Sequence, residues 1–349
     1  MPAASPPTRI LIVKLSSLGD IIHALPVASS LRATYPDARI AWAVESKWRP
    51  LLEHHPDLDE VFGVDSLGLR RHPHRWSELR DHVRAVRSFH PEWALDLQGT
   101  VKSAVLTQCS GAPHRVGLAR PVRREWAAGA AYTRRVRPRG AHRVEQLLDV
   151  AEALGPLRRD VRFLLPIPEP VQREADEWIR SNYIGEFAFF SPGGGWVSKR
   201  WPSARYGQLA DLLQQRYGLA AVLNRGPGEQ DLDDTYRRAN DIRARLFSGD
   251  VLQLAAVLRR ARLAIGGDTG PMQMAAALGV PTVALFGPTD PAINGPYGPH
   301  VVVLRKTTAT TYRRGSAYSQ AMLAIQPEEV ATACGALLAQ TAPADAVQP

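Results

Sequence analysis

One carboxylate stands where an apolar run gives way to a helix near the N-terminus. The run Ile10–Val13 is followed by Ser16, Ser17, Gly19 and Asp20. An aspartate at the carboxyl end of a strand can take a proton from a hydroxyl group as that hydroxyl attacks, which is general-base catalysis. Gly19 would leave room for the attacking molecule, and the serines could hydrogen-bond to it. Asp20 could equally cap the helix, so the spacing leaves both roles open.

A glycine-rich stretch in the second half has the composition of a phosphate-binding loop. FFSPGGGWVSKRWP (189–202) places Gly193, Gly194 and Gly195 after an apolar run and adds Lys199 shortly afterwards. Glycines let the backbone approach a ligand closely, and lysine supplies a point charge suited to phosphate. The stretch matches neither GxxxxGK[ST] nor GxGxxG, so a flexible connection is the alternative.

Two further strand exits carry similar residues. In IGGDTGPMQMAAALG (265–279), Asp268 and Thr269 precede a helix that begins near Gly270, and FGPTDP (286–291) is a second Gly/Pro turn. The positive end of a helix attracts diphosphate groups, although Asp268 or Thr269 could stand there as helix caps. Three such exits in one domain favour a site for a nucleotide diphosphate.

Short β-rich runs alternate with helical stretches in both halves, which is typical of an α/β fold with parallel, doubly wound sheets. The predicted strands are residues 9–13, 39–44, 94–97, 187–191, 220–223, 244–247, 263–265 and 282–286, the last of these being the final strand. The predicted helices are 21–34, 76–89, 101–109, 143–154, 205–216, one from about 229, 251–259, 271–278 and 328–338.

A proline-rich segment divides the chain. Leu165–Pro170 contains three prolines in six residues, which indicates a stiff, extended linker. We therefore predict an N-terminal domain over 9–165 and a second domain over 171–325, with a C-terminal helix over 326–340 that packs back on the first domain. Ligands of open α/β sheets bind at the carboxyl ends of the strands, so the two domains should face each other across a cleft.

Charge and composition narrow the partners. The net charge is +9 with a pI of about 9.9, and the stretch 115–143 carries nine arginines against one acid. This excess favours an anionic partner, such as a phosphorylated substrate, an acidic membrane face or nucleic acid, unless it reflects a general arginine bias on solvated surfaces. The sequence has no RNP motif, zinc finger or helix-turn-helix, so we expect no nucleic acid.

The remaining composition predicts a cytoplasmic protein without a metal or a cofactor. The two cysteines, Cys109 and Cys334, lack CxxC spacing, and the N-terminus lacks the basic and apolar parts of a secretory signal. Apolar runs long enough to span a membrane are absent from the sequence. Histidines and carboxylates with metal-ligand spacing, including HExxH, are absent too.

Four stretches together resemble the lipopolysaccharide heptosyltransferases, glycosyltransferase family 9, most closely the members that add the first heptose. They are RILIVKLSSLGDIIHALPVASSLRATYPDARIAWAVE (9–45), DLQGTVKSA (96–104), SKRWP (198–202) and GGDTGPMQMAAALGVPTVALFGPTDP (266–291). The resemblance implies a GT-B fold, with two Rossmann-like domains facing a cleft, the acceptor on the first and the donor on the second. It further implies an inverting, metal-free transfer of L-glycero-D-manno-heptose from ADP-heptose to Kdo-lipid A, by an enzyme peripherally attached to the inner leaflet of the inner membrane.

The family's site residues carry over to positions of this chain. The resemblance implies that Asp20 is the catalytic base and that Lys199 binds the diphosphate. Implied substrate-binding positions are Ser17, Gly19, Gly193, Gly194, Gly195, Glu229, Asp268, Thr269, Gly270 and Gln273, with Arg124 and His142 near the Kdo sugar.

One position departs from the family pattern. Members usually carry DTGxxH, and this chain has Gln273 in place of the histidine. A glutamine can donate a neutral hydrogen bond to phosphate but cannot carry a proton. The alternatives to the implied function are therefore a family member with another donor or acceptor, a second-heptose enzyme, a non-catalytic nucleotide-sugar-binding protein, and an epimerase of the same two-domain shape. A binding protein would have no need of Asp20.

Overall fold

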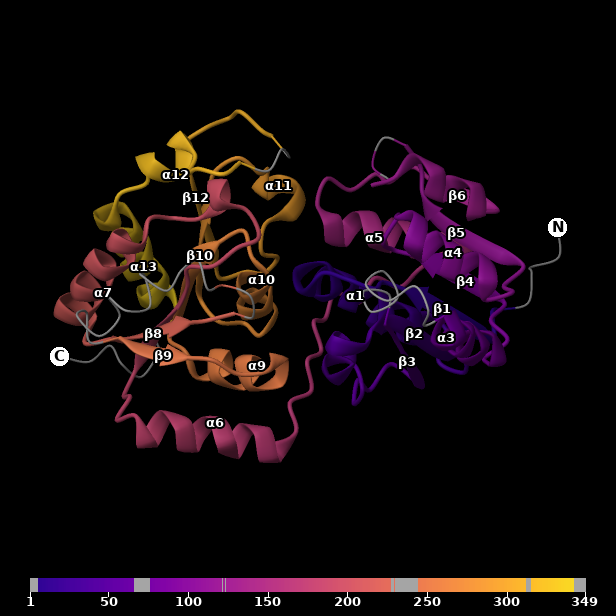
Figure 1. The fold of residues 1–349 in the computed structure, drawn as a ribbon, viewed down its shortest axis with the longest axis horizontal. Helices are drawn as coiled ribbons and strands as arrows, with labels where there is room; N and C mark the ends of the chain where they lie inside the picture. The colour runs from indigo at the N-terminus through magenta and orange to yellow at the C-terminus, as the bar shows by residue number, and fades with distance from the viewer. Residues whose placement is uncertain are drawn as a thin grey trace. The chain divides into compact units, whose positions relative to one another are not determined.

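The computed structural model describes residues 6–65, 76–120, 122, 124–226, 229, 244–311 and 315–341. The chain forms two compact units, Met1–Pro166 and Ile167–Pro349 (Figure 1). The division lies inside the proline-rich segment from which the sequence predicts a linker. Each unit has its own parallel sheet, so the predicted α/β fold with two doubly wound sheets is confirmed.

The first unit contains a six-stranded parallel sheet in the order β3-β2-β1-β4-β5-β6. The strands are β1 (Arg9–Val13), β2 (Arg39–Glu45), β3 (Glu60–Val64), β4 (Trp93–Asp96), β5 (His114–Leu118) and β6 (Arg134–Val136). Strand β1 is central and covered on both faces, which explains its unbroken apolar run. The sequence analysis missed β3, β5 and β6. Strand β3 is mostly half-buried, and β5 and β6 begin with basic residues that are exposed or half-buried.

The helices of the first unit cover this sheet. They are α1 (Leu18–Thr34), α3 (Trp76–Ser88), α4 (Val101–Cys109) and α5 (Arg143–Ala151), with the short 3₁₀ turns η1 (Ser46–Leu51), η3 (Trp126–Ala131) and η4 (Glu152–Leu154). Helix α1 is buried from Ile21 to Leu31 without a break and packs on α5. It begins three residues before the predicted start, because Ser17 is its N-cap.

The second unit repeats the design with a parallel sheet in the order β12-β11-β10-β7-β8-β9. The strands are β7 (Phe187–Ser191), β8 (Ala220–Asn224), β9 (Arg245–Phe247), β10 (Leu263–Gly267), β11 (Thr282–Phe286) and β12 (Val301–Arg305). Counted from its own first strand, this is the same 3-2-1-4-5-6 order as in the first unit, the Rossmann order. Strand β12 follows β11, so the prediction that residues 282–286 form the final strand is wrong.

The helices of the second unit are α6 (Glu169–Ser181), η5 (Val197–Lys199), α7 (Ser203–Tyr217), α9 (Val251–Arg260), α10 (Gly270–Ala277), α11 (Pro291–Asn294), α12 (Gln320–Ala324) and α13 (Pro327–Gln340). Helix α6 was not predicted, since the prolines that open it suggested a linker. The helix predicted from about residue 229 falls mainly outside the described residues.

The C-terminal helix requires a correction. Helix α13 packs on α7, β11 and β12, and its residues Val330, Ala331, Cys334 and Leu337 belong to the hydrophobic core of the second unit. The second unit therefore includes this helix and does not end at residue 325, and the packing of the helix on the first domain stays a prediction.

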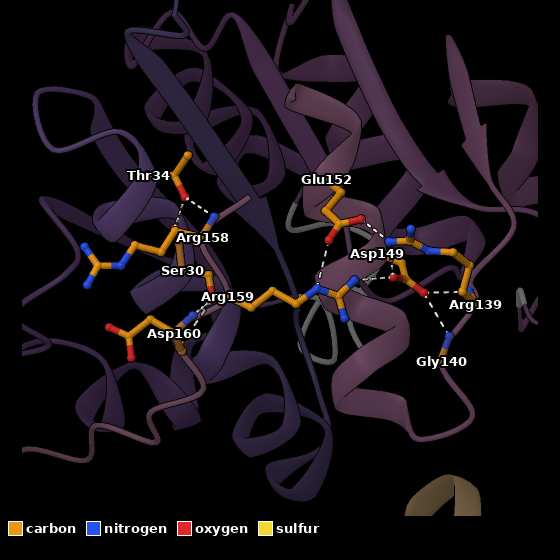
Figure 2. Close-up of polar contacts among 9 residues, drawn as sticks. All are labelled: Ser30, Thr34, Arg139, Gly140, Asp149, Glu152, Arg158, Arg159 and Asp160. Carbon is orange, nitrogen blue, oxygen red and sulfur yellow. Dashed lines mark hydrogen bonds and ion pairs between the residues drawn. The ribbon is translucent and has the colours of Figure 1, made fainter. Parts of the chain in front are cut away.

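A polar network fastens the end of the first unit to its core (Figure 2). The amide of Arg158 donates to Thr34 Oγ1 at 2.9 Å and the amide of Asp160 donates to Ser30 Oγ at 2.9 Å, both on α1. On α5, the nearly buried carboxylate of Asp149 accepts from the amides of Arg139 and Gly140 at 2.6 and 3.0 Å. These bonds hold the chain just before His142, the N-cap of α5.

Candidate functional site

Asp20 occupies the third position of helix α1, where it is both a cap and a mostly buried carboxylate. Its Oδ2 accepts from the amide of Ser17 at 3.0 Å and from Ser17 Oγ at 3.1 Å. This is half of a capping box, in which an acid in the first turn satisfies the N-cap amide. Asp20 is therefore a helix cap, as one of its two predicted roles requires, and the cap uses Oδ2 of the carboxylate.

The other oxygen, Oδ1, lies between two cations. Arg124 Nη2 is 2.5 Å from Oδ1, and Lys14 Nζ is 3.7 Å from it. The side chains of Lys14 and Asp20 are 1% and 14% exposed, whereas Arg124 is 42% exposed. Asp20 thus meets a buried lysine from one side and a solvent-accessible arginine from the other.

The charges around Asp20 set its protonation. Burial by itself would raise the pKa of this carboxyl, but attraction to Lys14 and Arg124 and the hydrogen bonds from Arg124 and Ser17 outweigh burial and hold the pKa well below its usual range. Burial lowers the pKa of Lys14 to about 8, with Asp20 opposing that shift and Arg124 adding to it. At neutral pH Asp20 is an ionised carboxylate.

The exits of β1 and β4 build this arrangement together. Lys14 Nζ donates to the carbonyl of Leu97 at 2.9 Å, and the amide of Ser16 donates to Gln98 Oε1 at 3.2 Å. The turn after β4 is organised by Asp96, a fully buried carboxylate. Asp96 accepts from the amides of Gln98 and Gly99, from Ser103 Oγ and from Tyr132 Oη, at 2.7 to 2.9 Å.

The same turn also fixes the segment that carries Arg124. The amide of Glu125 donates to the carbonyl of Gly99 at 3.0 Å, and Glu125 Oε2 accepts from the amide of Val101 at 2.8 Å. Residues far apart in sequence are therefore brought to one carboxylate. Sequence reasoning named Asp20, Ser17, Gly19 and Arg124 but missed Lys14, Asp96 and Gln98. The position of Lys14, a charged residue directly after a buried strand, was the one feature of the sequence that could have indicated its role.

His142 is the N-cap of α5, and its Nδ1 accepts from the amide of Val144 at 3.2 Å. Its ring lies edge-on to that of His23, with centroids 5.2 Å apart. Because His23 is three residues beyond Asp20 on α1, it lies on the same face of the helix. The structure thus places His142 on the side of α1 that carries Asp20, and His23 is a further residue that the sequence analysis did not single out.

In the second unit, Lys199 and Asp268 form an ion pair at the exits of β7 and β10. Lys199 Nζ is 2.5 Å from Asp268 Oδ2, and Thr289 Oγ1 donates to the same oxygen at 2.9 Å. Both charged side chains are mostly buried, at 17% and 14% exposed. The ammonium also lies 4.4 Å from the ring centroid of Trp196, a cation–π contact that sequence reasoning missed.

Glycines let the backbone segments of this site approach each other. A Cβ on Gly266 would lie 2.7 Å from the carbonyl oxygen of Ser191, and one on Gly267 would lie 2.8 Å from that of Lys199. Ser191 Oγ is 3.3 Å from Thr269 Oγ1, and Thr269 is the N-cap of α10, which begins at Gly270. The predicted phosphate-binding groups of β7 and β10 therefore lie together.

Glu229 joins this group through the glycine-rich loop. Its Oε2 accepts from the amide of Gly226 at 2.8 Å. A Cβ on Gly193 would lie only 1.6 Å from Glu229 Oε1, so the carboxylate rests directly against Gly193. Gly194 adopts a φ of +150° and its carbonyl accepts from Arg200 Nε at 2.9 Å, while Gly195 is exposed.

Gln273 has a partner that the sequence did not suggest. Its side chain is buried, and its Nε2 donates to the carbonyl of Asn294 at the end of α11, at 2.8 Å. Since the amide nitrogen is engaged there, it helps to fix α11 against α10. The predicted hydrogen bond from this amide to a diphosphate stays a prediction.

Two features are absent from the part of the chain that the structure describes. Within the described residues, groups of three or more histidine, cysteine or carboxylate side chains able to hold a metal ion do not occur. Among the helices that the structure describes, none combines the length and the apolar character needed to cross a bilayer.

Comparison with known proteins completes the description. Residues 79–321 match the model of glycosyltransferase family 9 (heptosyltransferase). Lipopolysaccharide heptosyltransferase 1 of Pseudomonas aeruginosa is 32% identical over 83% of this chain and 81% of its own length. Two solved structures share the fold. The family 9 glycosyl transferase of Veillonella parvula superposes with a TM-score of 0.81 and 25% identity, covering 96% of this chain and 98% of its own. ADP-heptose LPS heptosyltransferase II of Escherichia coli superposes with a TM-score of 0.78 and 24% identity, covering 95% of this chain and 99% of its own.

Proposed function

Because the chain belongs to glycosyltransferase family 9, the heptosyltransferases of lipopolysaccharide core biosynthesis, we propose that it transfers L-glycero-D-manno-heptose from ADP-heptose to a Kdo-lipid A acceptor, with inversion at the anomeric carbon. The observation that carries the proposal is the position of Asp20, an ionised carboxylate at the β1 exit whose Oδ1 is held by Lys14 and Arg124. Capping of α1 engages Oδ2 alone, so a protein that merely bound nucleotide sugars would have no use for the second oxygen, Oδ1, held between two cations.

Asp20 acts as the general base. It takes the proton of the acceptor hydroxyl while that oxygen forms the new bond to the anomeric carbon, and the bond from that carbon to the diphosphate breaks, so that ADP leaves with the electron pair. A carboxylate with a strongly lowered pKa is a weak base, however. The free protein therefore holds Asp20 in a stable but unreactive form.

Acceptor binding can release this restraint through Arg124. The arginine is the exposed member of the pair of cations, and Kdo carboxylates offer its guanidinium another planar anion. When Arg124 turns to the acceptor, Lys14 is the cation that remains beside Asp20. The pKa of Asp20 then rises, and the carboxylate becomes a stronger base when the acceptor is in place. Lys14, held by the Leu97 carbonyl, keeps the carboxylate in place.

The second unit binds the donor. Lys199, together with the amides at the start of α10 near Thr269 and Gly270, stabilises the departing diphosphate. Asp268 holds the lysine until the donor arrives and then binds hydroxyls of the heptose. Cations and amides do here what a metal ion does in other transferases. Glu229 binds the nucleoside side of ADP, and the backbone of the loop 193–195 approaches the diphosphate.

The first-heptose reaction is favoured by the likeness to heptosyltransferase 1 of Pseudomonas aeruginosa. We place the enzyme in the cytoplasm, at the inner face of the inner membrane, where such an acceptor is available. The test is to incubate the protein, in excess EDTA, with ADP-heptose and either Kdo-lipid A or the same acceptor already bearing one heptose. We expect ADP release and a heptosylated product from the first acceptor only. Absence of product from both acceptors would refute the proposal.

A further inference from the structure

Exposed apolar side chains gather on α4 and η3 of the first unit. Among the described residues, nine large hydrophobic side chains are exposed, and four of these lie in the first unit. Three of those four are Val101, Val105 and Trp126, which are 43%, 52% and 72% exposed. Single exposed apolar residues are ordinary on protein surfaces, but a group of them marks a site of interaction.

The three side chains belong to one surface. Val101 and Val105 are four residues apart on α4 and share a helix face. The adjoining Ala104 lies in a small buried cluster with Ala128, which fastens α4 to η3. Glu125, the residue before Trp126, accepts from the amide of Val101 at 2.8 Å. We call Val101, Val105, Trp126 and the neighbouring Arg120 the α4–η3 surface.

Two arginines lie close to Trp126, one in space and one in sequence. The guanidinium carbon of Arg120 lies 5.8 Å from the Trp126 ring centroid, and both side chains are exposed. Arg124, two residues before Trp126, is exposed as well and contacts Asp20. The acid in this stretch, Glu125, is engaged at the first amide of α4. The surface therefore combines apolar groups with positive charge, and it is continuous with the proposed acceptor site.

We propose that the α4–η3 surface docks on an anionic lipid bilayer, with Trp126 at the level of the head groups and Arg120 against lipid phosphates. Tryptophan is the side chain that favours the membrane–water boundary, and arginines near a negatively charged leaflet add attraction. A second copy of the chain is a poorer occupant, because a symmetric dimer would bring two arginine-rich faces together. The inference rests on the proposed function in one respect: docking here would bring Asp20 next to a lipid-anchored acceptor.

The test uses co-sedimentation of the full chain with vesicles of phosphatidylethanolamine and phosphatidylglycerol, and with phosphatidylcholine vesicles as a neutral surface. We expect binding to the anionic vesicles, at least about tenfold weaker binding by the triple variant Val101→Gln/Val105→Gln/Trp126→Gln, and roughly fivefold weaker binding by Arg120→Gln. The matched control is Tyr183→Asn, which removes an aromatic side chain that is 92% exposed in the second unit and should bind like the wild type.

Activity measurements separate this inference from the proposed function. The triple variant should turn over a deacylated, water-soluble acceptor like the wild type and should lose activity on acceptor embedded in anionic vesicles. Wild-type binding to anionic vesicles with no transfer to either acceptor would refute the proposed function and leave the docking surface standing. Equal vesicle binding by wild type and triple variant, or a change of solution mass in the triple variant, would overturn the docking surface.

Discussion

The two units place their charged groups at equivalent points of the same topology and use them in opposite ways. Each sheet has the order 3-2-1-4-5-6, and each site lies at the exits of the first and fourth strands, where the direction of winding changes. In the first unit one carboxylate, Asp20, faces two cations. In the second, one ammonium, Lys199, faces one carboxylate, Asp268.

The fourth strands differ as well. In the first unit β4 ends in Asp96, whose buried carboxylate collects four hydrogen bonds and shapes the turn. In the second, β10 ends in Gly266 and Gly267, where missing side chains allow close backbone approach. The first unit thus holds a carboxylate between two cations, and we propose that this excess of positive charge attracts the anionic acceptor. In the second unit one carboxylate balances the lysine, and we propose that the diphosphate of the donor takes its place.

The largest loss of turnover is expected from Asp20→Asn. The variant keeps the size of the side chain but cannot take a proton, so turnover should fall by about 10² to 10⁴. Affinity for ADP-heptose should not change, since the groups that we propose for donor binding lie in the other unit. Steady-state rates and donor titration measure the two effects, and turnover close to that of the wild type would leave Asp20 as a helix cap alone.

The second unit is tested by a pair of variants at its ion pair. Lys199→Ala should weaken ADP-heptose binding and turnover roughly 10- to 100-fold, because a charge-assisted contact to the diphosphate is lost. Asp268→Asn should tighten binding of ADP itself by a few fold, since it frees the lysine, while it lowers turnover. Calorimetric titration with ADP measures the affinity of each variant and so distinguishes weaker from tighter binding. If both variants bind ADP equally well, the lysine and the aspartate are a structural pair.

Arg124→Met probes the exposed cation of the first unit. A contact this exposed is screened by solvent, so kcat/KM for the acceptor should fall by only about tenfold. With one cation removed, the pKa of Asp20 is lowered less. The acid limb of the kcat/KM profile should therefore move to higher pH, since protonation of the base then begins nearer neutrality. An acid limb identical to that of the wild type would show that Arg124 does not act on Asp20.

The smallest effect is expected at Gln273, which is a member of neither ion pair. Gln273→Leu should lower the free energy of unfolding by about 1 to 3 kcal/mol, because the Asn294 carbonyl loses its donor. Donor affinity should change less than threefold. Thermal unfolding and ADP titration give both values, and a large loss of donor affinity with unchanged stability would restore the phosphate-binding role implied by the family pattern.

Local patterns in the sequence predicted much of this fold. Buried strands such as β1 and β7 are unbroken apolar runs, so they were found, and the prolines around residues 165–170 revealed the division between units. Strands β3 and β6 were not predicted, because they are half-exposed and so lack the unbroken apolar run that marks a buried strand. The site was predictable wherever one motif holds its residues, as with Lys199. Lys14 and Gln98 could not be assigned, because their roles arise from pairing of β1 with β4, residues more than 80 positions apart.

We propose that the acceptor takes Arg124 from Asp20 and so turns a restrained carboxylate into a base. The most direct measurement is the titration of the Asp20 carboxyl by ¹³C NMR, assigned with Asp20→Asn, in the free protein and with a soluble Kdo-bearing acceptor. We expect a pKa well below the usual aspartate range in the free protein and a clear rise when the acceptor is bound. An ordinary pKa in the free protein, or one that the acceptor leaves unchanged, would show that Arg124 does not control the basicity of Asp20.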